Sequence, residues 1–233
     1  MPDQSAARRE PLTLDEVVTH ALAIIDEHGS SGLSMRKLGA SLGVEGMALY
    51  HHVSGRADLL EAVVDRVLDG LMEDLHPRLV RTWQGYLQAL AHAIRERALS
   101  HPKAFPLVAT HHPAAPWLRP PLRDLSLVEH FLSTVTGHGF STEQAVAAYQ
   151  LYSSFLLGHL LLECAELGAA TAPDDEPVDE GGADIPQDDG RIDIEEFPTV
   201  AALRPELSQH TTQAQFEDGL ENLIDRLEMS ISQ

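Results

Sequence analysis

Hydrophobic residues recur at helical spacing from residue 13 onward, and polar caps mark where the helices begin. Thr13 and Glu16 match a capping box, in which the side chain of each residue accepts a hydrogen bond from the main-chain N–H of the other. The stretch that follows predicts a helix that ends at His28 and Gly29. Its apolar face consists of Val17, Val18, Ala21, Leu22, Ile24 and Ile25.

Residues 34–53, SMRKLGASLGVEGMALYHHV, predict two short helices joined by a tight turn. Ser34 is the expected N-cap of the first helix. Gly43 is expected to end that helix, because glycine readily adopts the left-handed conformation found at helix ends. The second helix is expected to begin at about Glu45 and to bury Leu49. A helix, a glycine turn and a second helix make up the helix-turn-helix unit that reads DNA.

The remainder of the chain keeps the helical pattern. Ser54 is the expected N-cap of a helix that continues to about Leu75. Six prolines within residues 102–121 restrict that segment to short helices and turns. Helical spacing returns in residues 83–100, 122–136, 141–167 and 211–229. Because no series of strands or internal repeat is visible, the predicted fold class is all-α.

Composition narrows the class of protein further. The chain has 233 residues, of which 43% are hydrophobic, and one cysteine, Cys164. A single cysteine excludes an intramolecular disulfide framework and a four-cysteine zinc site, and it suits a reducing cytoplasm. The first 30 residues hold no signal-peptide pattern. Apolar runs such as residues 155–162 fall far short of the roughly 20 residues that a membrane span needs, so we expect a cytoplasmic protein without a membrane partner.

The net charge of −20 is unevenly distributed along the chain. Residues 173–196 contain 11 acidic residues and one base, Arg191, a net charge of −10. We expect an acidic, mobile loop over residues 168–196, since this composition cannot form a packed core. Residues 1–60 contain five bases and eight acids. Affinity for DNA must therefore come from a local basic patch, and non-specific binding should be weak.

Three short motifs resemble the N-terminal domain of the tetracycline-repressor (TetR) family of transcriptional regulators. They are LGV at residues 42–44, LYHHV at 49–53 and DLL at 58–60. Shorter matches to the tetracycline-repressor branch itself follow at residues 82–83, 99–101, 139–143 and 216–221. The resemblance covers residues 13–66 closely and the remainder of the chain more sparsely.

The resemblance implies a domain order and a function. We expect a flexible arm over residues 1–12, a three-helix helix-turn-helix domain over 13–60, and a helical domain for effector binding and dimerisation over 61–233. It also implies a homodimeric repressor that binds a palindromic double-stranded DNA operator and is released by a small molecule. For this chain we expect no cofactor. The helices at 141–167 and 211–229 are the candidates for a four-helix dimer interface.

The DNA-contacting residues are assigned by the same resemblance. Arg36 matches a base-contacting arginine whose fork can bind guanine O6 and N7, although it can also be an ordinary solvated arginine. Arg56 matches a phosphate contact. His51 and His52 point about 100° apart on a helix, which disfavours a shared metal ion. The expected set is Ser34, Arg36, Lys37, Gly46, Met47, Ala48, Tyr50, His51, His52 and Arg56.

The effector site is expected to differ from that of tetracycline repressors. Met72, Leu90 and Phe131 fall where polar drug contacts lie in that branch, so we expect a hydrophobic ligand in place of tetracycline. His111 and His112 lie near the position of the family's metal ligand, and whether they bind a metal stays open. The alternative is that the apolar residues simply fill the core. The expected lining is Met72, Leu90, Ile94, Phe131, Val135, Val146 and Tyr149.

Two other classes of protein are alternatives to a DNA-binding regulator. An enzyme is disfavoured because the sequence lacks an H-E-x-x-H motif, a nucleophile elbow and a phosphate loop. A helical ligand-binding or protein-interaction module that has lost operator binding remains the alternative, since Gly46, Met47 and Ala48 offer few hydrogen bonds to bases.

Overall fold

The computed structural model describes residues 12–170, 196–208 and 212–231. The expected arm at 1–12 and the expected acidic loop at 168–196 therefore lie almost entirely outside the described residues. Every regular element in the described part of the chain is a helix, which confirms the all-α prediction.

Helix α1 (Leu14–His28) begins and ends where the sequence predicts. The capping box is present: Thr13 Oγ1 accepts from the Glu16 N–H at 3.2 Å, and Glu16 Oε2 accepts from the Thr13 N–H at 2.8 Å. The helix ends at Gly29, whose φ of 73° lies in the left-handed region. Its predicted apolar face is buried.

Helix α2 (Met35–Leu42) is capped by Ser34 and ends at Gly43, with φ 68° and ψ 31°, as predicted. The next element differs from the prediction. It is a six-residue 3₁₀-helix, η2 (Gly46–His51), instead of an α-helix. The N–H of Ala48 bonds to the Glu45 carbonyl, three residues back, and Glu45 provides no side-chain cap that would start an α-helical turn.

Helix α3 (Arg56–Val67) corrects two predictions. Its N-cap is Gly55 and not Ser54. The main-chain N–H of Ser54 instead donates to the Asp58 carboxylate at 2.7 Å. The helix also ends well before Leu75, and Gly70 follows it with φ 70° in a run of turns. The expected domain boundary at residue 60 falls inside this helix.

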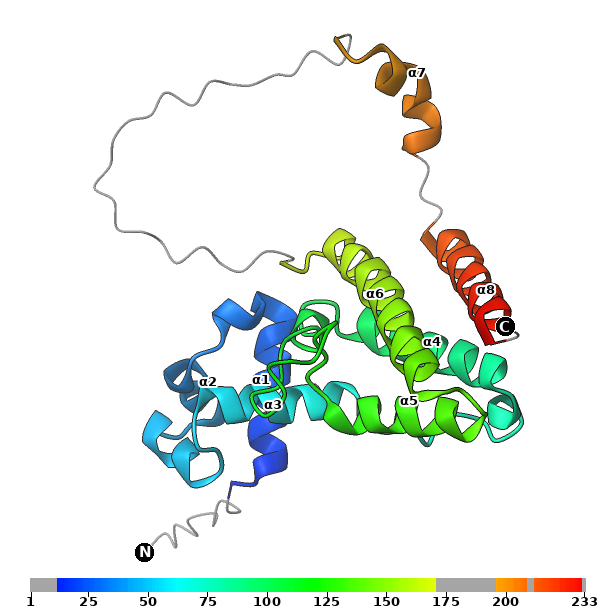
Figure 1. The fold of residues 1–233 in the computed structure, drawn as a ribbon. Coiled ribbons are helices and arrows are strands. Elements are labelled where there is room, and N and C mark those ends of the chain that lie inside the picture. The colour runs from blue at the N-terminus through cyan, green and yellow to red at the C-terminus, as the bar shows by residue number, and fades with distance from the viewer. Residues whose placement is uncertain (1–11, 171–195, 209–211, 232–233) are drawn as a thin grey trace, which may run out of the picture.

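The second half of the chain contains four helices that pack together and one that does not. Helices α4 (Trp83–Ser100), α5 (Leu125–Gly137), α6 (Thr142–Glu166) and α8 (Thr212–Ile231) lie close to the predicted ranges. Helix α6 packs beside α4, α5 and α8 (Figure 1). Helix α7 (Pro198–Leu207), which was not predicted, has no buried residue. Short 3₁₀-helices complete the described elements: η1 (Ser30–Gly32), η3 (Leu79–Arg81) and η4 (Phe105–Leu107).

A polar cluster joins α4, α6 and α8 inside this bundle. Glu163 is buried on α6 and accepts a hydrogen bond from Arg95 Nε on α4 at 3.0 Å. The Arg95 guanidinium lies 5.2 Å from the centre of the buried Phe216 ring on α8. Among the described helices, α6 alone is long and apolar enough to cross a membrane. A core helix has the same composition, and the partners of α6 place it in the core of the bundle.

Candidate nucleic-acid interface and buried cavity

Two glycines set the distance between α2 and η2. A Cβ atom on Gly39 would lie 2.9 Å from the Gly46 nitrogen and 2.9 Å from the Val44 carbonyl oxygen. A Cβ atom on Gly46 would lie 3.2 Å from the Met35 carbonyl oxygen. Both contacts involve main-chain atoms that cannot rotate away. The absence of side chains at these positions therefore allows the two halves of the helix-turn-helix to touch.

This packing bears on the expected role of Gly46. The site of its missing side chain faces the main chain of α2, so Gly46 serves as a packing position, and a contact with DNA could come only from its main chain. Gly39 was not predicted as a functional position at all. A glycine inside an otherwise helical stretch is the available signal, since it costs helix stability unless close packing requires it.

The remaining predicted DNA contacts lie on one continuous segment. Seven of them are exposed, and they are Ser34, Arg36, Lys37, Met47, Tyr50, His51 and Arg56. Met47 is 72% exposed and Tyr50 is 48% exposed, although an isolated domain gains nothing by exposing large apolar side chains. Ala48 and His52 are half-buried, while Leu49 and Val53, which follow them in turn, are buried. The buried positions orient the outward face of η2.

Ser34 and Arg56 already have partners within the chain. The Ser34 hydroxyl accepts from the Lys37 N–H at 3.2 Å as the helix cap. Arg56 Nη2 donates to the Ser30 carbonyl at 2.8 Å, and the side chain remains exposed. The Arg56 side chain therefore lies beside η1, with donors left for a phosphate oxygen.

A small buried cavity lies between α4, α5 and α6. Its volume is about 20 Å³, which is enough for roughly one water molecule. Ligand sites for small molecules usually measure about 300–1,000 Å³. The walls must therefore move apart before a molecule of that size can enter. The lining residues are Leu90, Ile94, Val108, Leu122, Leu127, Val128, Phe131, Tyr149, Tyr152, Ser153, Leu156 and Leu157.

The structure divides the seven predicted lining residues. Four of them, Leu90, Ile94, Phe131 and Tyr149, border the cavity. Met72 and Val135 pack elsewhere in the core. Val146 is 45% exposed and is not among the residues that line the cavity. Val146 is therefore withdrawn from the predicted lining.

Several lining residues were not predicted from the sequence. Tyr152, Ser153, Leu156 and Leu157 follow Tyr149 at helical spacing, so that periodicity was an available signal. Val108 lies within the proline-rich segment and Leu122 follows it directly; this segment has no periodicity, and nothing in the sequence marks the two residues as neighbours.

The polar groups around the cavity are already bonded to the protein. The hydroxyl of Tyr149 donates to the Pro120 carbonyl at 2.9 Å, and that of Tyr152 donates to the Leu87 carbonyl at 2.9 Å. Burial raises the pKa of Tyr149 to about 12 and also raises the pKa values of Tyr152 and Tyr86. These three buried tyrosines are thus neutral. No charged side chain is among the lining residues of the described chain, so the cavity favours uncharged, apolar groups.

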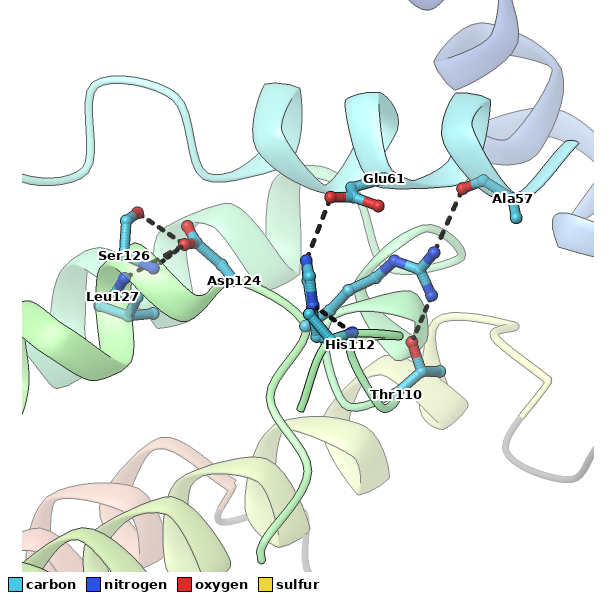
Figure 2. Close-up of polar contacts among 9 residues, drawn as sticks. Ala57, Glu61, Thr110, His112, Asp124, Ser126 and Leu127 are labelled. Atoms are coloured by element: carbon cyan, nitrogen blue, oxygen red, sulfur yellow. Dashed lines mark hydrogen bonds and ion pairs between the residues drawn. The ribbon is translucent and has the colours of Figure 1, made fainter. Parts of the chain in front are cut away.

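His111 and His112 have protein partners. His112 Nδ1 accepts from the Ala114 N–H at 3.0 Å, which leaves the proton on Nε2, 3.1 Å from the Glu61 carboxylate (Figure 2). His111 Nε2 accepts from Arg119 at 2.8 Å. Within the described residues, no group of three or more histidine, cysteine or acidic side chains is arranged to hold a metal ion.

Polar contacts connect the helix-turn-helix region to the helical bundle at two places. At the end of α1, Asp26 bonds to His101 Nδ1 at 2.9 Å, and the Glu27 carbonyl accepts from Lys103 at 2.8 Å. Along α3, the Ala57 carbonyl accepts from Arg123 at 3.2 Å, beside the contact of Glu61 with His112 (Figure 2).

Family comparisons match most of the chain. Residues 17–63 match the family described as bacterial regulatory proteins, tetR family. Residues 76–231 match the tetracyclin repressor-like, C-terminal domain.

Individual relatives agree with these matches. Tetracycline repressor protein class E of Escherichia coli is 32% identical over 154 residues, which cover 66% of this chain and 70% of that protein. The HTH-type transcriptional repressor DrrR1 of Streptomyces coeruleorubidus is 26% identical over 232 residues, which cover 98% and 82% of the two chains.

Solved structures share the fold. A possible TetR family transcriptional regulator from Streptomyces coelicolor A3(2) superposes with a TM-score of 0.71 at 26% identity, over 93% of this chain and 99% of that one. ActR from Streptomyces coelicolor, solved in complex with actinorhodin, superposes with a TM-score of 0.66 over 95% and 97% of the two chains. At 23% identity, the likeness to ActR concerns the fold alone.

Proposed function

The chain belongs to the TetR family of transcriptional repressors, with an N-terminal helix-turn-helix DNA-binding domain and a C-terminal ligand-binding domain, and from this premise we propose its mode of action. It binds a palindromic operator in the cytoplasm as a homodimer and leaves the DNA when a hydrophobic molecule enters the bundle. Residues 13–60 form the DNA-binding unit and residues 61–233 the effector and dimer unit. Membership of a family of regulators gives no support to an enzyme.

The observation that carries the DNA-binding proposal is the outward face of η2 and the start of α2. Arg36 and Lys37 project from α2, while Met47 and Tyr50 are exposed on η2, held by buried Leu49. Arg36 is the candidate for a bidentate contact to guanine, and exposed Met47 can pack on a thymine methyl group. Lys37, Tyr50, His51, His52 and Arg56 are candidates for phosphate contacts. Ser34 orders the helix that presents them.

Helix α6 supports the homodimer. Its surface outside the bundle includes Leu151 and Leu162, which are 42% and 70% exposed. Gly158 lies on the same helix, and a Cβ atom there would meet nothing within 4 Å. A long helix with an exposed apolar and small-residue face is suited to pack against its own copy about a two-fold axis. Palindromic half-sites in DNA match that symmetry.

The apolar cavity supports the choice of effector class. Eight aliphatic side chains and three aromatic rings border it, and the tyrosine hydroxyls already bond to carbonyl oxygens. A charged ligand would lose its hydration there without gaining a hydrogen-bond partner, at a cost on the order of several kcal/mol. An uncharged hydrophobic molecule avoids this cost.

A binding titration tests the proposal. The purified chain is titrated against labelled DNA from the region flanking its own gene, at two salt concentrations, with and without a panel of neutral hydrophobic compounds. We expect salt-dependent binding with one dimer per site, and release by members of the neutral panel. Absent or salt-insensitive binding would favour a module that has lost operator recognition. Release by tetracycline with magnesium would overturn the assignment of a different, hydrophobic effector.

A further inference from the structure

Arg123 links the wall of the buried cavity to the DNA-binding domain. Its main-chain N–H donates to the Val108 carbonyl at 3.0 Å. Its guanidinium donates from Nη1 to Thr110 Oγ1 at 3.3 Å and from Nη2 to the Ala57 carbonyl at 3.2 Å (Figure 2). One residue thus bonds both to the proline-rich segment and to the first turn of α3.

The main chain around Arg123 is the wall of the cavity. Leu122, which precedes it, and Val108, to which it bonds, both line the cavity. Asp124, which follows it, caps α5 by accepting from the N–H groups of Ser126 at 2.7 Å and Leu127 at 3.1 Å (Figure 2). Leu127 also lines the cavity. Any outward movement of this wall therefore moves the backbone of Arg123.

The hydrogen bond from Arg123 to the Ala57 carbonyl lies close in sequence to η2, the element proposed to contact DNA. Ala57 follows Arg56, a candidate phosphate contact, and only residues 52–55 separate α3 from the end of η2. A displacement of the first turn of α3 is therefore passed directly to the DNA-contacting face. The second connection between the domains, Lys103 to the Glu27 carbonyl, reaches the far end of α1 instead.

The contacts of the guanidinium make it easy to displace. Both hydrogen bonds are at the long end of the usual range. Arg123 Nε is buried without a hydrogen-bond partner. The nearby acidic side chains are Glu61, Asp65 and Asp124, and His112 lies among them. Alternative acceptors for the Arg123 guanidinium are thus within the same cluster, so a small shift of the backbone can exchange the hydrogen-bond partners of the guanidinium.

We propose that Arg123 is the positioning residue that transmits expansion of the cavity to α3 and so to the DNA-binding face. The proposal rests on the proposed function, because it assumes that filling the cavity weakens operator binding. Arg123 itself touches neither the DNA nor the effector. It acts by holding Ala57 at a distance fixed by the wall that carries Leu122 and Val108.

The coupling is testable without knowing the effector, because a side chain can fill the cavity permanently. Ser153 lines the cavity and is 7% exposed. A benzyl group at this position is much larger than the space of about 20 Å³, so Ser153→Phe must push the walls apart. Val128→Phe is the second filler, placed on the α5 wall, and replaces Ser153→Phe if that variant fails to fold by circular dichroism.

The experiment is a double-mutant cycle on the full chain, with fluorescence anisotropy on the flanking-DNA duplex as readout. The filler is combined with Arg123→Met, and separately with Lys103→Met as the matched control, which also removes one cation-to-carbonyl bond between the domains. We expect the cavity-filling substitution to weaken DNA affinity at least tenfold in the otherwise wild-type chain, which keeps Arg123, and also in the chain that carries Lys103→Met. In the Arg123→Met background we expect a loss of less than threefold.

The outcomes separate this proposal from the proposed function. An equal loss in the Arg123→Met background would overturn the role of Arg123 and leave effector-controlled DNA binding intact. A folded filler variant that keeps full DNA affinity would also overturn the proposal, since expansion would then not reach α3. A wild-type chain that binds no DNA refutes the proposed function itself, and with it this coupling.

Discussion

Replacing Gly39 by alanine tests the packing of α2 against η2 directly. A Cβ atom there would lie 2.9 Å from each of two main-chain atoms, the Gly46 nitrogen and the Val44 carbonyl oxygen. Real Cβ atoms do not approach so closely, so α2 and η2 must separate. The change adds one methyl group, which elsewhere in a helix would be favourable.

The magnitude follows from two opposing effects. Alanine in place of glycine within a helix stabilises by about 0.5–1 kcal/mol. Forcing an extra carbon into a tightly packed site costs about 1–3 kcal/mol, and more when the neighbour is main chain that cannot change rotamer. We therefore expect Gly39→Ala to lower the free energy of unfolding by about 1–2 kcal/mol. Because the separation also rotates the outward face of η2, operator affinity should fall by more than the loss of folded protein explains.

Urea unfolding followed by circular dichroism measures the first effect, and anisotropy with the flanking-DNA duplex measures the second. Gly137→Ala is the matched control, because Gly137 ends α5 and a Cβ atom there would meet nothing within 4 Å. The control should be neutral or slightly stabilising and should keep full DNA affinity. If Gly39→Ala behaves like the control in both assays, the close approach of the two segments does not determine the geometry of the site.

Three further measurements follow from the structure. Arg36→Ala should cost about 1–3 kcal/mol of binding free energy and relax base preference at one position of the operator. Arg56→Ala should weaken binding to all DNA sequences alike and reduce the slope of affinity against salt by about one. Equal losses for Arg36→Ala on every DNA sequence would mean that Arg36 contacts phosphate and not a base. Burial raises the pKa of Tyr149 from 10.0 to about 12, so its neutral form stabilises the folded chain below pH 10, and this contribution is lost as the pH rises from 10 to 12. At pH 11, the absorbance of the folded chain at 295 nm should report at most one ionised tyrosine of four. Ionisation of three or four tyrosines without unfolding would contradict the burial of Tyr86, Tyr149 and Tyr152. Glu163→Gln removes the charge that pairs with Arg95, whose side chain is 17% exposed, and should lower the free energy of unfolding by about 2–3 kcal/mol in urea; a loss below about 0.5 kcal/mol would mean that the pair is not important for stability.

Local signals in the sequence account for what was predicted well. The capping box at Thr13, the cap at Ser34 and the left-handed glycines at 29 and 43 each act within about four residues, so the elements they bound follow from the sequence. The form of η2 does not. Six residues lie between two turns without a side-chain cap, and contact with α2 determines their conformation. The start of α3 was also predicted wrongly, although its contact is local: the Ser54 N–H donates to the Asp58 carboxylate four residues later, and Gly55 is the N-cap.

The cavity was only partly predictable for a different physical reason. Helix α6 carries apolar residues on several faces, so its periodicity does not say which of them faces α4 and α5, and Val146 was placed on the wrong side. The segment between η4 and α5 has no periodicity, and its course is determined by tertiary hydrogen bonds such as that from Arg123 to the Val108 carbonyl. Such contacts join residues whose pairing no local pattern encodes.

The small size of the cavity has a consequence for the effector concentration at which the regulator responds. Opening a closed site reduces the apparent affinity for the effector by the fraction of molecules that are open. Thermodynamic linkage also makes the coupling reciprocal: the factor by which the effector weakens operator binding is the factor by which the operator weakens effector binding. Molecules free in the cell therefore capture the effector before those on DNA do. The dose that starts transcription then rises with the number of copies of the regulator, and a cell can set its threshold by how much of this protein it makes.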